Sequence, residues 1–146
     1  MKVIEDGDKV SITCEIRLED GRVYFKNDKK NPIELVVGEG DFFPAVESEL
    51  INMKEGETKE ILLEPKDAFG PRMEELIVDV SKDVFPPNAN IREGSRVKIG
   101  TPSGKVIYGT VIGVKENSFT IDLNHPLAGK RLIFVVTVIS IEKRNQ

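Results

Sequence analysis

The fold is decided by NHPLAGK at residues 124–130 and by LIFVVTVISI at residues 132–141, which follows it almost directly. The second stretch is the longest nearly continuous apolar run of the chain and is rich in β-branched residues. It is too short to cross a bilayer, so it predicts a strand buried on both faces at the centre of a sheet. Because this central strand comes last, its partner strands must lie far upstream. The preceding stretch, with its Pro and Gly, therefore indicates one domain interrupted by a second.

The composition is that of a globular chain. The 146 residues are 39% hydrophobic and 32% charged, with a formal net charge of −4, which argues against bulk affinity for nucleic acid or anionic membranes. No apolar targeting segment follows Met1 and no apolar run is long enough to span a membrane, so we expect a cytoplasmic protein. Residues 71–129 carry seven basic and seven acidic side chains. We expect this neutral segment to face unfolded chains without selecting them by charge.

The chain has one Cys and one His, which excludes the usual zinc ligand sets and an internal disulfide. We expect no metal and no cofactor. Cys14 and His125 could form a thiol–imidazole pair, but Cys14 sits in the middle of an apolar strand face, where a cysteine is usually an inert hydrophobic residue.

Hydrophobic periodicity predicts the remaining elements. Residues 9–18 alternate between apolar and polar side chains, as in a half-buried strand, and Asp20-Gly21 then predicts a hairpin turn. A short helix is predicted after residue 40, with Asp41 as its cap and Pro44 in its first turn. Further strands are predicted at residues 23–25, 32–37, 58–64, 74–80, 93–100, 105–114 and 118–122.

These residues resemble a known family. Asp20-Gly21, residues 38–50, Gly56-Glu57 and residues 67–70 (Asp-Ala-Phe-Gly) resemble the FK506-binding-protein (FKBP) class of peptidyl-prolyl isomerases. The insertion that ends in Asn-His-Pro-Leu-Ala-Gly is similar to the SlyD/SlpA branch, which carries an extra insert-in-flap domain. The resemblance implies an α+β, mostly β fold, in which an antiparallel sheet wraps on a short helix and carries a small all-β insert. It implies an isomerase domain of residues 1–72 and 125–146, and an inserted chaperone domain of residues 73–124.

The resemblance also implies an activity that needs little chemistry. Rotation about an X-Pro bond crosses a barrier of roughly 20 kcal/mol without moving a proton, so a dry apolar pocket that favours the twisted amide is sufficient. Phe43 would offer its backbone N–H to the substrate, and His125 and Leu127 would lie at the rim. The implied catalytic pocket consists of Cys14, Tyr24, Phe25, Phe43, Val46, Phe69 and Phe134, and further substrate contacts are expected from Leu35, Phe42, His125 and Leu127.

The chain departs from the family pattern at three of these positions. Cys14 stands where the family usually has a tyrosine, Phe25 where it has an aspartate, and Phe69 replaces a second tyrosine. We therefore expect a peptidyl-prolyl cis-trans isomerase of reduced activity. The alternative is a holdase or assembly chaperone whose isomerase site is weak or inactive. A third reading, an RNA-binding barrel, is disfavoured by the neutral insert.

The insert is expected to bind unfolded chains through exposed apolar side chains. A small β domain needs about half of its apolar residues for its own core. The preferred binding patch is Ile77, Val78, Val80 and Phe85, because both flanks of that segment carry turn-forming or charged residues. The expected partners are unfolded or proline-containing polypeptides, with FK506-like macrolides as further ligands, and the protein is expected to be a monomer.

Overall fold

The protein, seen here as a computed structural model that describes residues 2–144, divides into two compact units. Unit 1 comprises Met1–Gly70 and Gly129–Gln146, and unit 2 comprises Pro71–Ala128. Unit 1 is thus discontinuous in sequence. The division falls after residues 70 and 128, whereas the sequence-based boundaries lie after residues 72 and 124.

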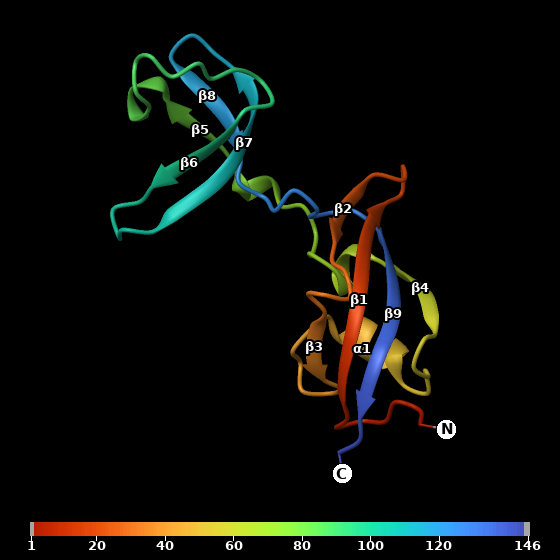
Figure 1. Cartoon of the computed structure of the whole chain (residues 1–146). Helices are drawn as coiled ribbons and strands as arrows, with labels where there is room; N and C mark the ends of the chain where they lie inside the picture. The colour runs from red at the N-terminus through yellow and green to blue at the C-terminus, as the bar shows by residue number, and fades with distance from the viewer. Residues whose placement is uncertain (1, 145–146) are drawn as a thin grey trace. The chain divides into compact units, whose positions relative to one another are not determined.

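Unit 1 is built on an antiparallel sheet of five strands in the order β2-β1-β9-β4, with β3 also pairing with β1. The last strand, β9, lies between β1 and β4, which confirms its predicted central position (Figure 1). The strands are β1 (Lys9–Leu18), β2 (Val23–Lys26), β3 (Ile33–Val36), β4 (Thr58–Leu63) and β9 (Leu132–Glu142).

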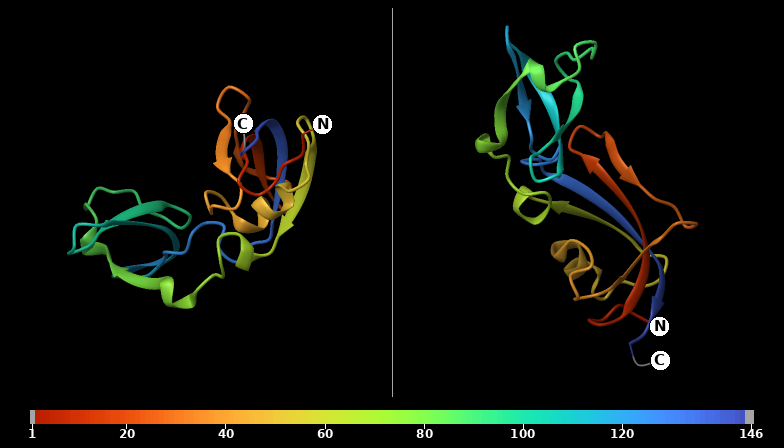
Figure 2. Two further views of the ribbon diagram at one scale, coloured as in Figure 1. Left: turned by 90° about the horizontal axis from the view of Figure 1, so that it is seen from below. Right: turned by 90° about the vertical axis from the view of Figure 1, so that its left-hand side faces the viewer.

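The two faces of β9 differ in burial. Leu132, Phe134 and Val136 on one face have no exposed surface, whereas Ile133 and Val135 on the other are only half-buried. The prediction that this strand is buried on both faces is therefore wrong. The helix α1 (Pro44–Leu50) lies against only one face of the sheet, as the views of Figure 2 show.

The helix forms where it was predicted but begins differently. Pro44 occupies its first turn, where a missing N–H costs no hydrogen bond, and Val46 and Leu50 are fully buried. The N-cap is Phe43, which makes no side-chain capping bond. Asp41 lies two residues too early to cap the helix, and its carboxylate instead accepts the Val36 N–H at 3.0 Å. The predicted capping role of Asp41 is wrong for this reason.

Unit 2 is a four-stranded antiparallel sheet in the order β5-β8-β7-β6. Val111 and Ile121 are fully buried in its core and Phe119 nearly so. Glu74–Leu76, predicted as the start of a strand, forms the short 3₁₀ helix η2 with exposed side chains. The other elements are β5 (Ile77–Ser81), η3 (Lys82–Val84), β6 (Arg96–Gly100), β7 (Val106–Val114) and β8 (Ser118–Asp122); η1 (Pro65–Asp67) belongs to unit 1.

The two ends of the described chain lie together at one end of unit 1 (Figures 1 and 2). Asp8, which is 1% exposed, accepts hydrogen bonds from Lys143 Nζ at 2.5 Å and from the Arg144 N–H at 3.0 Å. A buried carboxylate thus joins the N-terminal segment to the end of β9. Across residues 2–144, the structure contains no helix long and apolar enough to cross a membrane.

Candidate functional site

Five aromatic side chains of unit 1 form a continuous cluster, here called the aromatic cluster. Phe43 is its centre, with ring centroids 5.0 Å from Phe42, 5.0 Å from Phe134 and 5.4 Å from Phe69. Phe42 also contacts Phe134 at 6.2 Å, and Tyr24 extends the cluster from Phe69 at 6.5 Å. Each of these pairs meets edge to face, the arrangement that the quadrupoles of aromatic rings favour.

The cluster draws on four separate segments of unit 1. Tyr24 lies on β2, Phe42 and Phe43 directly precede α1, Phe69 follows η1, and Phe134 lies on β9. Tyr24, Phe43, Phe69 and Phe134 are four of the seven residues predicted for the catalytic pocket. Phe42 was predicted as a substrate contact.

The backbone of Phe43 is arranged as the start of a helix requires. Its carbonyl accepts the N–H groups of Val46 and Glu47, both at 2.9 Å. Within residues 2–144 the Phe43 N–H itself donates no hydrogen bond. It is one of the unpaired donors at a helix N-terminus, and its partial positive charge suits a carbonyl oxygen.

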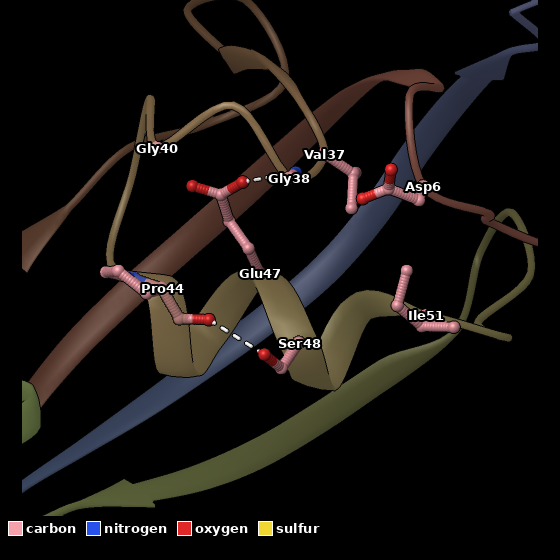
Figure 3. A pocket seen from close by; sticks show the side chains of 8 residues that line it. All are labelled: Asp6, Val37, Gly38, Gly40, Pro44, Glu47, Ser48 and Ile51. Atoms are coloured by element: carbon pink, nitrogen blue, oxygen red, sulfur yellow. Dashed lines mark hydrogen bonds between the residues drawn. The ribbon is translucent and has the colours of Figure 1, made fainter.

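Glu47 holds the loop that leads to Phe43, and the sequence analysis did not single it out. Glu47 is 4% exposed. One oxygen of its carboxylate accepts the Gly38 N–H at 2.7 Å (Figure 3). The other oxygen accepts the Phe42 N–H at 2.9 Å. The carboxylate therefore fixes both ends of the turn between β3 and α1. An acidic residue in the first turn of a helix is a recognisable signal, but only the tertiary structure shows which amides it binds.

A cavity of about 270 Å³ opens beside Glu47 (Figure 3). The carboxylate of Asp6 lies so close to Gly38 that a Cβ added there would collide with it. None of the predicted site residues lines this cavity. Its walls are Asp6, Val37, Gly38, Gly40, Pro44, Glu47, Ser48 and Ile51.

Three predicted site residues, Cys14, Leu35 and Val46, lie in the core of unit 1 outside the aromatic cluster, with at most 3% of their surface exposed. Burial, and secondarily the charge of Glu15, raises the pKa of the Cys14 thiol to about 12. The thiol is therefore neutral and unreactive at physiological pH, which removes the basis for a thiol–imidazole pair.

Phe25 lies outside the aromatic cluster. It sits on β2 opposite Ile16, and 40% of its surface is exposed. The structure gives its ring no aromatic contact within residues 2–144. Its neighbour Tyr24, at the point where the register of β1 and β2 shifts, is the β2 residue that reaches Phe69.

Asn124 fastens the base of unit 2. Its side-chain oxygen accepts the Met73 N–H at 2.9 Å, and its side-chain nitrogen donates to the Met73 carbonyl at 3.0 Å and to Asp122 at 2.7 Å. Arg72 pairs with the same Asp122 at 2.9 Å. The segment that enters unit 2 and the segment that leaves it are thus joined by one buried side-chain amide and one ion pair.

His125 orders the turn that follows Asn124. Its Nδ1 accepts the Leu127 N–H at 3.0 Å, which requires Nδ1 to be unprotonated, and its carbonyl accepts the Ala128 N–H at 2.9 Å. Burial, and secondarily the charge of Arg96, lowers the pKa of His125. Leu127 is 2% exposed. The expectation that His125 and Leu127 lie at the pocket rim stays a prediction.

Part of the predicted binding patch on unit 2 is packed into the core. Val80 and Phe85 pack against the buried cluster around Phe119, and the Phe85 and Phe119 rings meet at 5.6 Å. Ile77 and Val78 are half-buried. The large apolar side chains that unit 2 does expose are Met73, Leu76, Val84, Val106, Ile107, Tyr108, Ile112 and Val114.

Across residues 2–144, no group of three or more His, Cys, Asp or Glu side chains is placed to hold a metal ion.

Comparison with known proteins gives consistent matches. The family described as FKBP-type peptidyl-prolyl cis-trans isomerase matches residues 2–139. The chain is 37% identical over 134 residues to the FKBP-type peptidyl-prolyl cis-trans isomerase SlyD of Treponema pallidum, an alignment that covers 92% of this chain and 76% of that protein. It is 30% identical over 138 residues to a short-type peptidyl-prolyl cis-trans isomerase of Methanocaldococcus jannaschii, covering 94% and 85%.

Two further matches are also to FKBP-type proteins. The SlyD protein of Escherichia coli is 30% identical over 146 residues, covering 100% of this chain and 74% of that protein. A crystal structure of the three FKBP domains of wheat FKBP73 superposes with a TM-score of 0.53 at 17% identity, covering 97% of this chain and 41% of that one. At that identity the likeness concerns the fold alone.

Proposed function

The chain belongs to the FKBP-type peptidyl-prolyl cis-trans isomerases, and from this premise we propose that unit 1 catalyses rotation about X-Pro bonds at the aromatic cluster. The observation that carries the proposal is the set of three rings around Phe43, those of Phe42, Phe69 and Phe134. Proline is apolar and carries no N–H, so aromatic walls can accept its ring without leaving a donor unpaired. No nucleophile or general base is needed, which agrees with a site that contains neither.

The rate enhancement follows from two properties of such a site. The twisted amide of the transition state has lost resonance and part of its dipole, so an apolar surrounding disfavours it less than it disfavours the planar ground state. The Phe43 N–H, which has no partner within residues 2–144, can hold a neighbouring substrate carbonyl and fix the orientation of the bond that rotates. Within the cluster Phe134 is fully buried, whereas Phe42, Phe43, Phe69 and Tyr24 retain surface for contact.

We assign capture of unfolded or partly folded chains to unit 2, making the protein a folding isomerase with chaperone activity. Exposed apolar side chains such as Val106, Ile107 and Tyr108 support this assignment, because a monomeric domain without a partner rarely leaves so many together. The clients are proline-containing polypeptides, and FK506-like macrolides are further ligands of unit 1. The protein acts as a monomer in the cytoplasm, where its unpaired Cys14 stays reduced.

A second candidate function is that of a holdase with a weak or inactive isomerase site. The observation that favours it is the loss of polar groups from the site. Cys14 and Phe25 stand where the family usually has a tyrosine and an aspartate, and in this chain Cys14 is buried and Phe25 is exposed outside the cluster.

A protease-free cis–trans assay on a short proline peptide, run beside the refolding of a protein limited by proline isomerisation, separates the two. We expect catalysis in both assays. Suppression of aggregation with no catalysis in either assay would establish the holdase and refute the isomerase.

A further inference from the structure

The charges of unit 2 are unevenly distributed although they sum to zero. Arg72 and Lys115 form ion pairs with Asp122 and Asp79 at 2.9 and 2.8 Å. Lys82 lies over the Phe119 ring at 5.4 Å. The four remaining cations have no carboxylate partner within residues 2–144, and all belong to β6 or its flanks: Arg92, Arg96, Lys98 and Lys105.

The register of β6 and β7 places one of these cations opposite an exposed aromatic side chain and a second opposite a threonine. Lys98 lies directly opposite Tyr108, and Arg96 opposite Thr110, to whose hydroxyl it donates at 2.8 Å. Residues directly opposite in an antiparallel pair point to the same face of the sheet. Tyr108 is 60% exposed.

The same face continues to the end of the hairpin. Val106, opposite Gly100, is 51% exposed, and it points to the same side as Tyr108 because the two are separated by one residue. Val97 and Ile99, which alternate with the cations along β6, pack against the core instead. We call the surface formed by Arg96, Lys98, Val106 and Tyr108 the hairpin face.

Three of the five acids of unit 2 without an ion pair in residues 2–144 lie on the other side of the sheet. Glu74, Glu75 and Asp83 belong to η2 and η3, which flank β5, and β5 and β6 are the two opposite edges of the sheet (Figure 1). Of the other two, Glu116 lies between β7 and β8, and Glu93 lies beside Arg92 in the β6 flank, where four cations outnumber it. The neutral sum of charges over residues 71–129 thus coexists with an excess of cations that are unpaired within residues 2–144 along β6 and its flanks.

We propose that the hairpin face binds client segments in which apolar residues are flanked by glutamate or aspartate. The inference rests on the proposed capture function of unit 2 and specifies the class of client. Apolar residues of the client lie against Val106 and Tyr108, and its carboxylates meet Lys98 and Arg96, which lack intramolecular carboxylate partners in residues 2–144. Because these groups are exposed, charge adds selectivity and faster encounter more than affinity.

A polypeptide fits this surface better than a nucleic acid does. Two cations beside a valine and a tyrosine neutralise few phosphates, and the acids around β5 oppose a polyanion that extends across the unit. The chain as a whole carries a net charge of −4. An apolar peptide with a few carboxylates matches both the charge and the apolar area.

The test uses the full chain and two fluorescein-labelled peptides with the same Phe- and Leu-containing centre, one flanked by glutamates and the other by lysines. We expect the glutamate-flanked peptide to bind about three- to tenfold more tightly at low salt, with the difference shrinking as salt screens the exposed charges. The variant K98E should remove most of this preference. K29E makes the same change in net charge on an exposed loop of unit 1 and should leave the preference intact.

Two further measurements keep the outcomes distinct. Thermal unfolding followed by circular dichroism shows that K98E is folded, and the milder K98Q should show an intermediate preference. Equal binding of both peptides to the wild-type chain overturns the inference while leaving capture in place. No binding of either peptide overturns capture itself, and tighter binding of a labelled single-stranded oligonucleotide than of the glutamate-flanked peptide identifies a nucleic-acid surface instead.

Discussion

Asn124 holds Met73 at both of its backbone polar groups, accepting its N–H at 2.9 Å and donating to its carbonyl at 3.0 Å. The side-chain amide thus replaces a strand partner at the place where the chain enters and leaves unit 2. Because Asn124 is 7% exposed, water cannot easily substitute for it. The Asn of the NHPLAGK stretch therefore has a structural role that is independent of any contact with substrate.

Replacing Asn124 with Ala should loosen the base of unit 2. The Met73 N–H and carbonyl would lose their partners, at a cost of about 1–3 kcal/mol, so the Met73 amide should exchange its hydrogen about tenfold faster or more. Hydrogen exchange measures this directly. Asn117→Ala, at an exposed turn of the same unit, is the matched control. An unchanged exchange rate of the Met73 amide in N124A would show that the Asn124 side chain does not stabilise the base of unit 2.

Phe69→Ala should lower kcat/KM for a short proline peptide by about five- to tenfold, because it removes the ring that links Tyr24 to Phe43. Phe25→Ala should change kcat/KM by less than about twofold, since Phe25 is exposed outside the aromatic cluster. The two variants delete the same side chain and differ only in position. Equal losses in both would place Phe25 within the catalytic pocket and contradict the assignment made here.

Glu47→Ala should impair catalysis although Glu47 is not expected to touch substrate. Its carboxylate fixes the Gly38 and Phe42 amides and so the position of the Phe43 N–H. The Gly38 and Phe42 amides should exchange faster in E47A and to a lesser extent in E47Q, which retains one acceptor oxygen. kcat/KM should fall in the same order.

Ser48→Ala provides the control for Glu47, because Ser48 lines the same cavity and its hydroxyl donates to the Pro44 carbonyl within the helix. It should leave both amide exchange and kcat/KM close to the wild-type values. If E47A accelerates exchange at Gly38 and Phe42 but leaves kcat/KM unchanged, Glu47 stabilises the loop without positioning the site.

Asp8 should make the stability of unit 1 sensitive to acid. Burial by itself raises the pKa of Asp8, but hydrogen bonds from Lys143, Arg144 and Glu5 outweigh it and lower the pKa below its usual value. In the acid range the folded state therefore binds fewer protons than the unfolded state. The contribution of Asp8 to the free energy of unfolding is present above the ordinary carboxyl pKa of about 3.9 and is lost as pH falls through the lower pKa of the folded state.

Asp8→Asn should make the free energy of unfolding depend less steeply on pH in the acid range, here called the acid limb. It should also lower the free energy of unfolding at neutral pH by about 1–3 kcal/mol. Urea unfolding across the acid range measures both effects. Asp83→Asn is the control, since the Asp83 side chain makes no hydrogen bond or ion pair within residues 2–144. Parallel acid limbs for D8N and the wild-type chain would show that Asp8 does not titrate as described.

Local sequence pattern was sufficient for much of the sheet. The alternation in residues 9–18 gave the bounds of β1, and Asp20-Gly21 gave a hairpin in which Gly21 adopts a φ of 93°, which only glycine adopts without strain. The central place of β9 followed from its apolar run. Its half-buried outer face did not, because β-branched residues tolerate partial exposure and hydrophobicity alone does not show which face is covered.

The parts that sequence did not predict depend on contacts between distant residues. Asp122 is 50 positions from Arg72, and Asn124 is 51 positions from Met73, so neither pairing can be read from spacing. Glu47 likewise binds the Gly38 amide across a turn. The separation of charge in unit 2 follows from which cations gain carboxylate partners, so a count over residues 71–129 could only give their sum.

If unit 2 captures chains for a catalytic unit 1, removing unit 2 should separate the two activities. The Gly129 N–H donates to the Gly70 carbonyl at 2.8 Å, so residues 71–128 can be replaced by a short glycine-rich turn without displacing either end of unit 1. The most direct measurement compares this deletion variant with the full chain on a short proline peptide and on the refolding of a proline-limited protein. We predict similar kcat/KM on the peptide and a loss of about tenfold or more on the refolding protein. Equal losses on both substrates, or none on either, in a folded deletion variant would contradict the account.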